Sequence, residues 1–112
     1  MCIPSVGSRD FNSKRDESRD FATYVQREML ASLRTANTSV KDLGVKQAPF
    51  VVLIGAEMPS VLAEISFITN PQEARLLKTN TYRQKIAQAL FEGVRKYQAS
   101  LKTGLAVAAQ QN

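Results

Sequence analysis

The chain has 112 residues, 44% of them hydrophobic and 22% charged, which is the composition of one ordinary globular domain at most. Its net charge of +5 favours an anionic partner such as nucleic acid, an anionic membrane or an acidic cell-wall polymer. The basic residues are spread out and match no nucleic-acid motif, and no apolar run is long enough to span a membrane. Cys2 is the single cysteine and histidine is absent, which excludes a disulfide framework and a cysteine-rich zinc site.

Residues 1–16 are polar, contain Pro4 and Gly7, and show no hydrophobic periodicity. We expect them to form a disordered arm that precedes the folded part of the chain. The same stretch lacks the apolar centre and the small-residue cleavage site of a signal peptide. No export signal is therefore expected in this sequence.

A helix is predicted from Ser18 to Leu33. The apolar residues of this segment recur at helical spacing, as Phe21, Val25, Met29 and Leu33. A polar connection follows over residues 37–47, with a turn at Gly44.

Two short apolar runs predict strands that are buried on both faces. The first is Phe50–Ile54, which is rich in β-branched residues, and the second is Val61–Phe67, which follows a turn containing Pro59. Two such strands need helices above and below them. The predicted fold class is therefore α/β, with two buried strands flanked by helices and with less sheet than a complete domain would have.

The rest of the chain is predicted to be helical. Asn70 is a suitable N-cap for a short helix that begins at Pro71. The spacing from Thr81 to Gln84 predicts the start of a longer helix, and a fraying tail is expected over residues 103–112. One apolar stripe of this helix is made of Ile86, Leu90, Val94, Tyr97 and Leu101.

Glu64 is the main candidate for chemistry, because it places a carboxylate in the middle of an apolar strand. A buried carboxylate is retained chiefly where it transfers protons or closes an ion pair. The residue types alone favour these two roles equally. Helix capping accounts for Asn70, and a core or rim position accounts for Tyr82 and Tyr97. A turn with a buried side chain is the simpler account of Met58, and its position before the strand is also compatible with lining a cleft. A solvated helix face accounts for the basic residues Arg83, Lys85, Arg95 and Lys96.

The chain over roughly residues 17–98 resembles the C-terminal half of the zinc-dependent N-acetylmuramoyl-L-alanine amidases of the bacterial cell wall, and Ser18–Leu33 and Gly44–Lys46 fit as well as the stretch from Ala48 onward. The resemblance rests on a Val-Leu strand, on the Met-Pro-x-Val-Leu-x-Glu-Ile-x-Phe pattern at Met58–Phe67, and on Asn70-Pro71 opening a helix. It continues through a further set of matching positions: Leu77, Tyr82-Arg83, Ile86-Ala87, Ala89-Leu90, Gly93-Val94 and Tyr97. We expect residues 17–102 to be the C-terminal half of such a catalytic domain.

The resemblance implies a hydrolase that cleaves the amide between the lactyl group and L-alanine in peptidoglycan. In the family a zinc ion activates water and a glutamate, here Glu64, moves the proton. It also implies a periplasmic or cell-wall location, with peptidoglycan as the partner and without nucleic acid.

The sequence departs from the family in two respects. Ser66 stands where the family usually has glycine, and the zinc ligands belong to an N-terminal half that this sequence does not contain. We therefore assign no metal ligand and no cofactor-binding residue, and expect the chain alone to be inactive. The missing half of the domain is a candidate partner. Two alternatives stay open, a non-catalytic peptidoglycan-binding or regulatory remnant and a truncated chain that does not fold stably.

Overall fold

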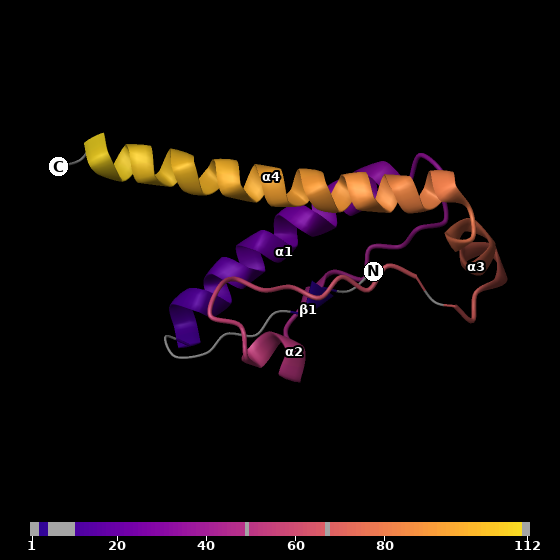
Figure 1. The fold of residues 1–112 in the computed structure, drawn as a ribbon, viewed down its shortest axis with the longest axis horizontal. Coiled ribbons are helices and arrows are strands. Elements are labelled where there is room, and N and C mark those ends of the chain that lie inside the picture. Colours follow the sequence, from indigo (N-terminus) through magenta and orange to yellow (C-terminus); the bar gives the residue numbers. More distant parts are fainter. Residues whose placement is uncertain (1–2, 5–10, 49, 67, 111–112) are drawn as a thin grey trace.

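The computed structural model describes residues 3–4, 11–48, 50–66 and 68–110 of the chain. Two long helices dominate it, α1 at Phe11–Leu33 and α4 at Asn80–Gln110. The smaller elements are β1 at Ile3–Pro4, β2 at Val45–Lys46, α2 at Val51–Ile54 and α3 at Pro71–Leu77. Figure 1 shows α4 running obliquely across α1 in the opposite direction, with α2 and α3 away from this crossing.

The core lies between α1 and α4. Its largest fully buried side chains are Met29, Leu33 and Val25 of α1. The buried stripe of α4 consists of Tyr82, Ile86, Ala89, Gly93 and Tyr97. This stripe differs from the predicted one in that Val94 and Leu101 are exposed, at 39% and 46%. The small residues Ala89 and Gly93 face α1 instead, because they let the two helix backbones approach closely.

Both later helices begin with a side-chain cap. The Asn70 side chain accepts hydrogen bonds from the backbone N–H groups of Gln72 and Glu73, at 3.0 and 3.2 Å, which confirms the predicted cap of α3. The cap of helix α4 lies two residues before the predicted position, and the helix begins at Asn80. The hydroxyl of Thr79, rather than that of Thr81, accepts the bond from the Tyr82 N–H at 3.3 Å.

The prediction of a strand at Phe50–Ile54 is wrong, because residues 51–54 form the short helix α2. Val51 and Val52 are 86% and 71% exposed, and only Leu53 of the run is buried among the described side chains. The described part of the chain offers this run no neighbouring strand. Its backbone bonds locally instead, from the Leu53 N–H to the Phe50 carbonyl.

Residues 61–66 lie outside any strand of the described sheet, apart from a bridge at Glu64, and Phe67 is outside the described residues. The sheet that the structure contains is instead a parallel pair, β1 and β2, with Ile3 opposite Val45 and Pro4 opposite Lys46. Gly44 has a positive φ of 83° just before β2, as its predicted turn requires. The two buried strands flanked by helices are thus not found, and the described fold is mostly helical.

The ends of the chain are also more regular than predicted. The expected arm, residues 1–16, contains β1 and the first turns of α1, while Cys2 and residues 5–10 lie outside the described residues. The expected tail, residues 103–112, continues α4 as far as Gln110. None of the described helices is long and apolar enough to cross a membrane.

Candidate functional site

Glu64 is the exposed residue of an irregular segment whose neighbouring side chains are partly buried. Val61 and Ile65 are partly buried against the core of α1 and α4, whereas the Glu64 side chain between them is exposed. The prediction that Glu64 is buried is therefore wrong, because its side chain is exposed while its neighbours at residues 61–63 and 65–66 are partly buried.

A hydrogen bond to α1 fixes the start of the Glu64 segment. The backbone N–H of Ser60 donates to the Ser18 hydroxyl at 3.0 Å, and Ser18 is completely buried. The Ser60 hydroxyl also donates to the Leu53 carbonyl at 3.4 Å. Glu64 lies four residues after this anchor, and its side chain is exposed.

The other residues considered from sequence have structural roles. Tyr82 and Tyr97 are core residues, at 2% and 7% exposure, and Asn70 caps α3. Met58 is 68% exposed, so the prediction of a buried Met58 is wrong.

Four basic residues of α4, those considered from sequence, each interact with a neighbouring side chain. Arg83 donates to the Asn80 side chain, Lys85 donates to the Thr35 hydroxyl, and Lys96 forms an ion pair with Glu28. Arg95 forms an ion pair with Glu92 at 2.7 Å. The hydrogen bond from Arg95 lowers the pKa of the Glu92 carboxyl, and the same bond raises the pKa of Arg95. These interactions lie on the surface of α4, and none of them involves Glu64.

The donor set of this chain does not fit a catalytic zinc site, which takes three protein ligands from His, Asp, Glu or Cys. The sequence has no histidine. Among the residues that the structure describes, no three Cys, Asp or Glu side chains come together as a possible metal-binding group.

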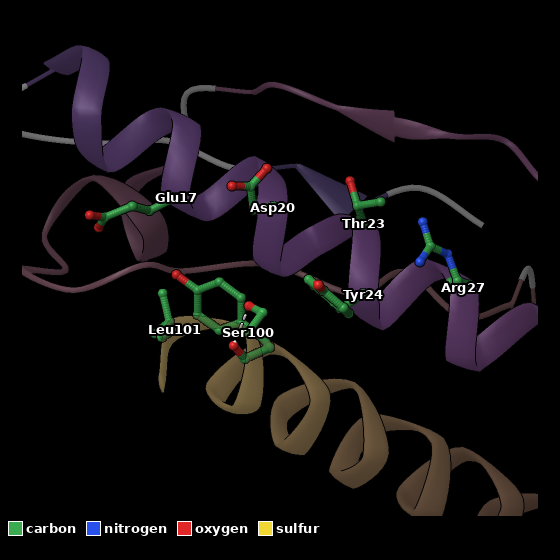
Figure 2. A pocket seen from close by; sticks show the side chains of 8 residues that line it. Glu17, Asp20, Thr23, Tyr24, Arg27, Ser100 and Leu101 are labelled. Carbon is green, nitrogen blue, oxygen red and sulfur yellow. Dashed lines mark hydrogen bonds between the residues drawn. The ribbon is translucent and has the colours of Figure 1, made fainter. Parts of the chain in front are cut away.

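A groove that the sequence analysis did not identify lies between α1 and the last third of α4. It has a volume of about 410 Å³, and Figure 2 shows Glu17, Asp20, Tyr24 and Arg27 following one another along α1, with Ser100 and Leu101 across from them. The spacing of Glu17, Asp20, Tyr24 and Arg27 places them on one helix face, a pattern that was visible in the sequence.

Tyr24 and Tyr97, which line this groove, make aromatic contacts. The ring of Tyr97 stacks on that of Phe21, with centroids 4.9 Å apart, and lies 6.2 Å from that of Tyr24. The Tyr97 hydroxyl is buried and has no hydrogen-bond partner among the described residues. Burial raises the pKa of Tyr97, and the negative charges of Glu17 and Asp20 raise it further.

Comparison with known proteins shows one consistent family. The sequence profile described as N-acetylmuramoyl-L-alanine amidase matches residues 6–96. The N-acetylmuramoyl-L-alanine amidase AmiA of Escherichia coli (strain K12) is 62% identical over 52 residues, which are 46% of this chain and 18% of that protein.

Two relatives come from Bacillus subtilis (strain 168). The N-acetylmuramoyl-L-alanine amidase LytC is 42% identical over 86 residues, covering 77% of this chain and 15% of that protein. The uncharacterized protein YqiI is 40% identical over 82 residues, covering 73% of this chain and 37% of that protein. The chain therefore spans well under half the length of these relatives, and no solved structure matches it.

Proposed function

Because the chain belongs to the N-acetylmuramoyl-L-alanine amidase family, we propose that it is the carboxylate-bearing part of a cell-wall amidase, with Glu64 as the proton-transfer residue. The observation that carries this proposal is the family match over residues 6–96, which includes the whole Glu64 segment. Amides are cleaved by attack of water on the carbonyl carbon and departure of the amine. A carboxylate can take the proton of the water and return it to the leaving nitrogen.

The exposure of Glu64 suits this role. The side chain is exposed, so a substrate can reach it, and the Ser60–Ser18 hydrogen bond holds the segment on helix α1. We place the substrate bond in peptidoglycan, between the lactyl group and L-alanine, and we place the site of action at the cell wall. In the family the metal supplies an activated water. The zinc ligands must come from a segment that this sequence does not contain, because the residues described do not fit that ion.

Exposed apolar side chains support a partner segment. Val51, Val52 and Ile68 are 86%, 71% and 83% exposed, and they flank the Glu64 segment on both sides along the chain. Exposed apolar residues gathered in one stretch are typical of a surface that another polypeptide covers. We therefore propose that the remaining part of an amidase domain packs over residues 50–68 and brings the metal to Glu64.

A chimeric enzyme tests the proposal. The 86 aligned residues of the 42%-identical relative are replaced by the matching residues of this chain, and release of stem peptide from purified peptidoglycan is measured. We expect the chimera to be active and Glu64→Gln to lower its rate by about 10²- to 10⁴-fold, the usual contribution of a general base. Glu57→Gln is the control, because Glu57 is another exposed carboxylate of the same loop.

Two outcomes contradict the proposal. A folded chimera without activity would show that these residues do not function in an amidase. An active chimera that tolerates Glu64→Gln as well as Glu57→Gln would remove the proton-transfer role from Glu64.

A further inference from the structure

Ser18 is a polar residue at the start of the buried apolar stripe of α1. It is completely buried, and its spacing from Ala22 and Val25 places it on the helix face that packs into the core. A hydroxyl in such a position is unfavourable unless it is hydrogen-bonded. The Ser18 hydroxyl accepts a bond from the backbone N–H of Ser60, at 3.0 Å, across forty-two residues of sequence. Ser18 therefore joins α1 to the segment that carries Glu64.

This segment contacts the helix pair on both sides of Glu64 along the chain. Before Glu64, Ser60 bonds to Ser18 and Val61 is partly buried against the core of α1 and α4. Directly after Glu64, Ile65 is partly buried against the same core. Apolar contacts are non-directional, whereas a hydrogen bond restricts both a distance and an angle. The bond to Ser18 therefore restricts the position of the backbone more closely than the apolar contacts do.

We propose that Ser18 is a positioning residue for Glu64 and acts through the backbone of Ser60. This inference rests on the proposed role of Glu64 in proton transfer. A general base must lie within about 2.6 to 3.2 Å of the group whose proton it takes, and a misplacement of about 1 Å can slow a reaction about 100-fold. Because Ser18 is completely buried, it affects the reaction only through the position of the segment.

Amide hydrogen exchange of the 112-residue chain tests the link itself. Ser18→Ala removes the acceptor and keeps the Cβ atom in the core, so we expect the chain to fold and the Ser60 amide to exchange at least about tenfold faster. Ser32→Ala is the matched control, because Ser32 is another α1 serine whose hydroxyl donates to a distant backbone group, the Lys85 carbonyl, at 3.4 Å. Unchanged exchange at Ser60 in the Ser18 variant would overturn the proposal.

A chimera that carries residues 6–96 in place of the matching part of the 42%-identical relative tests the effect on the reaction. We expect Ser18→Ala to lower kcat by about 10- to 100-fold and to leave KM within about twofold, because it changes geometry at the reacting bond. In a Glu64→Gln chimera the same substitution should lower the rate by no more than about twofold, since the base that it positions is gone. Ser32→Ala should leave kcat within about twofold in both chimeras.

The pair of chimeras separates a positioning role from a merely structural one. If Ser18→Ala slows both chimeras by the same factor, Ser18 acts on the fold and the proposal is overturned. If Glu64→Gln slows the reaction and Ser18→Ala does not, the role of Ser18 is overturned while the proposed function stands. A rate that does not change with Glu64→Gln contradicts the proposed function and removes the role of Ser18 with it.

Discussion

Gly93 of α4 lies directly against the backbone of Val25 of α1. A Cβ atom on Gly93 would come within 2.9 Å of the Val25 Cα and 3.0 Å of its Cγ2. Distances this short leave no room for any side chain at position 93. The closest approach of the two long helices is therefore set by the absence of a side chain at this one residue.

Gly93→Ala should destabilise the chain by about 1 kcal/mol or more. Alanine favours a helix interior over glycine by about 1 kcal/mol, but overpacking a tight contact typically costs about 1 to 3 kcal/mol. Urea unfolding followed by circular dichroism measures the difference. Gly55→Ala is the control and should change stability by less than about 0.5 kcal/mol, because no atom lies within 4 Å of its Cβ position. A stabilised Gly93→Ala chain would contradict the crossing described here.

The start of α4 can be tested by comparing two threonines. Thr79→Ala should lower the free energy of unfolding by about 1 kcal/mol, because the Thr79 hydroxyl accepts the Tyr82 N–H at the helix start. Thr81→Ala should be neutral or slightly stabilising, since Thr81 is exposed within the helix. A larger loss of stability from Thr81→Ala than from Thr79→Ala would support the cap at Thr81 that the sequence predicts.

Leu53 and Val52 distinguish the helix α2 from the predicted buried strand. Leu53→Ala should cost about 2 kcal/mol or more, because Leu53 is 3% exposed. Val52→Ala should change stability by less than about 0.5 kcal/mol, because Val52 is 71% exposed. Comparable losses from both substitutions in thermal unfolding would indicate a strand covered on both faces.

Asp42, in the loop before β2, should make the stability of the folded chain depend on pH. The Asp42 carboxylate accepts hydrogen bonds from the Gln26 side chain at 2.7 Å and from the Gly44 N–H at 2.8 Å, and these bonds lower the pKa of Asp42 from its ordinary value of 3.8. Because the pKa is lower in the folded chain, the carboxylate stabilises the fold above about pH 3.8 and loses this effect as the pH falls through the folded value.

Carboxyl-carbon NMR titration checks this assignment. Gln26→Leu should move the pKa of Asp42 upward, toward its ordinary value, because it removes the first of the two donors. Gln88→Leu on the exposed face of α4 should leave the titration of Asp42 unchanged. An unshifted titration in the Gln26 variant would show that the backbone N–H of Gly44 alone is responsible.

The chain by itself should not hydrolyse peptidoglycan and should not bind zinc in stoichiometric amounts. The reason is the donor set, since histidine is absent from the sequence and the described residues contain no metal-binding group. Isothermal titration with zinc and an assay of new amino groups released from peptidoglycan measure both. Tight binding of one zinc per chain would show that our account of the ligands is wrong.

The sequence predicts the helices of this chain better than its strands. The helical spacing of Val25, Met29 and Leu33 is sufficient to predict α1, because the apolar stripes of α1 and α4 pack against each other. The apolar run at Phe50–Ile54 is different. A strand exists only if a neighbour accepts its hydrogen bonds, and residues of this chain alone do not tell whether that neighbour is present.

The candidate site shows the same division. The residue type and motif predict Glu64 as the candidate, and this remains a prediction, whereas its exposure depends on tertiary packing that the sequence does not give. The spacing of Glu17, Asp20 and Tyr24 in the sequence places them on one helix face. The groove also needs Tyr97, which lies more than seventy residues later in the chain. Side-chain spacing predicts which residues of one helix share a face, whereas the residues that lie opposite them depend on tertiary packing.

The hydrogen bond between Ser60 and Ser18 links the position of Glu64 to a helix forty-two residues earlier in the chain. An extended chain advances about 3.3 Å per residue, so Glu64 lies at most about 13 Å along the chain from this anchor. A change in α1 that tilts or rotates Ser18 would therefore displace Glu64 without altering any residue of the family motif. Two chains with identical motifs could then differ in activity, and comparison of their motif residues alone would not reveal why.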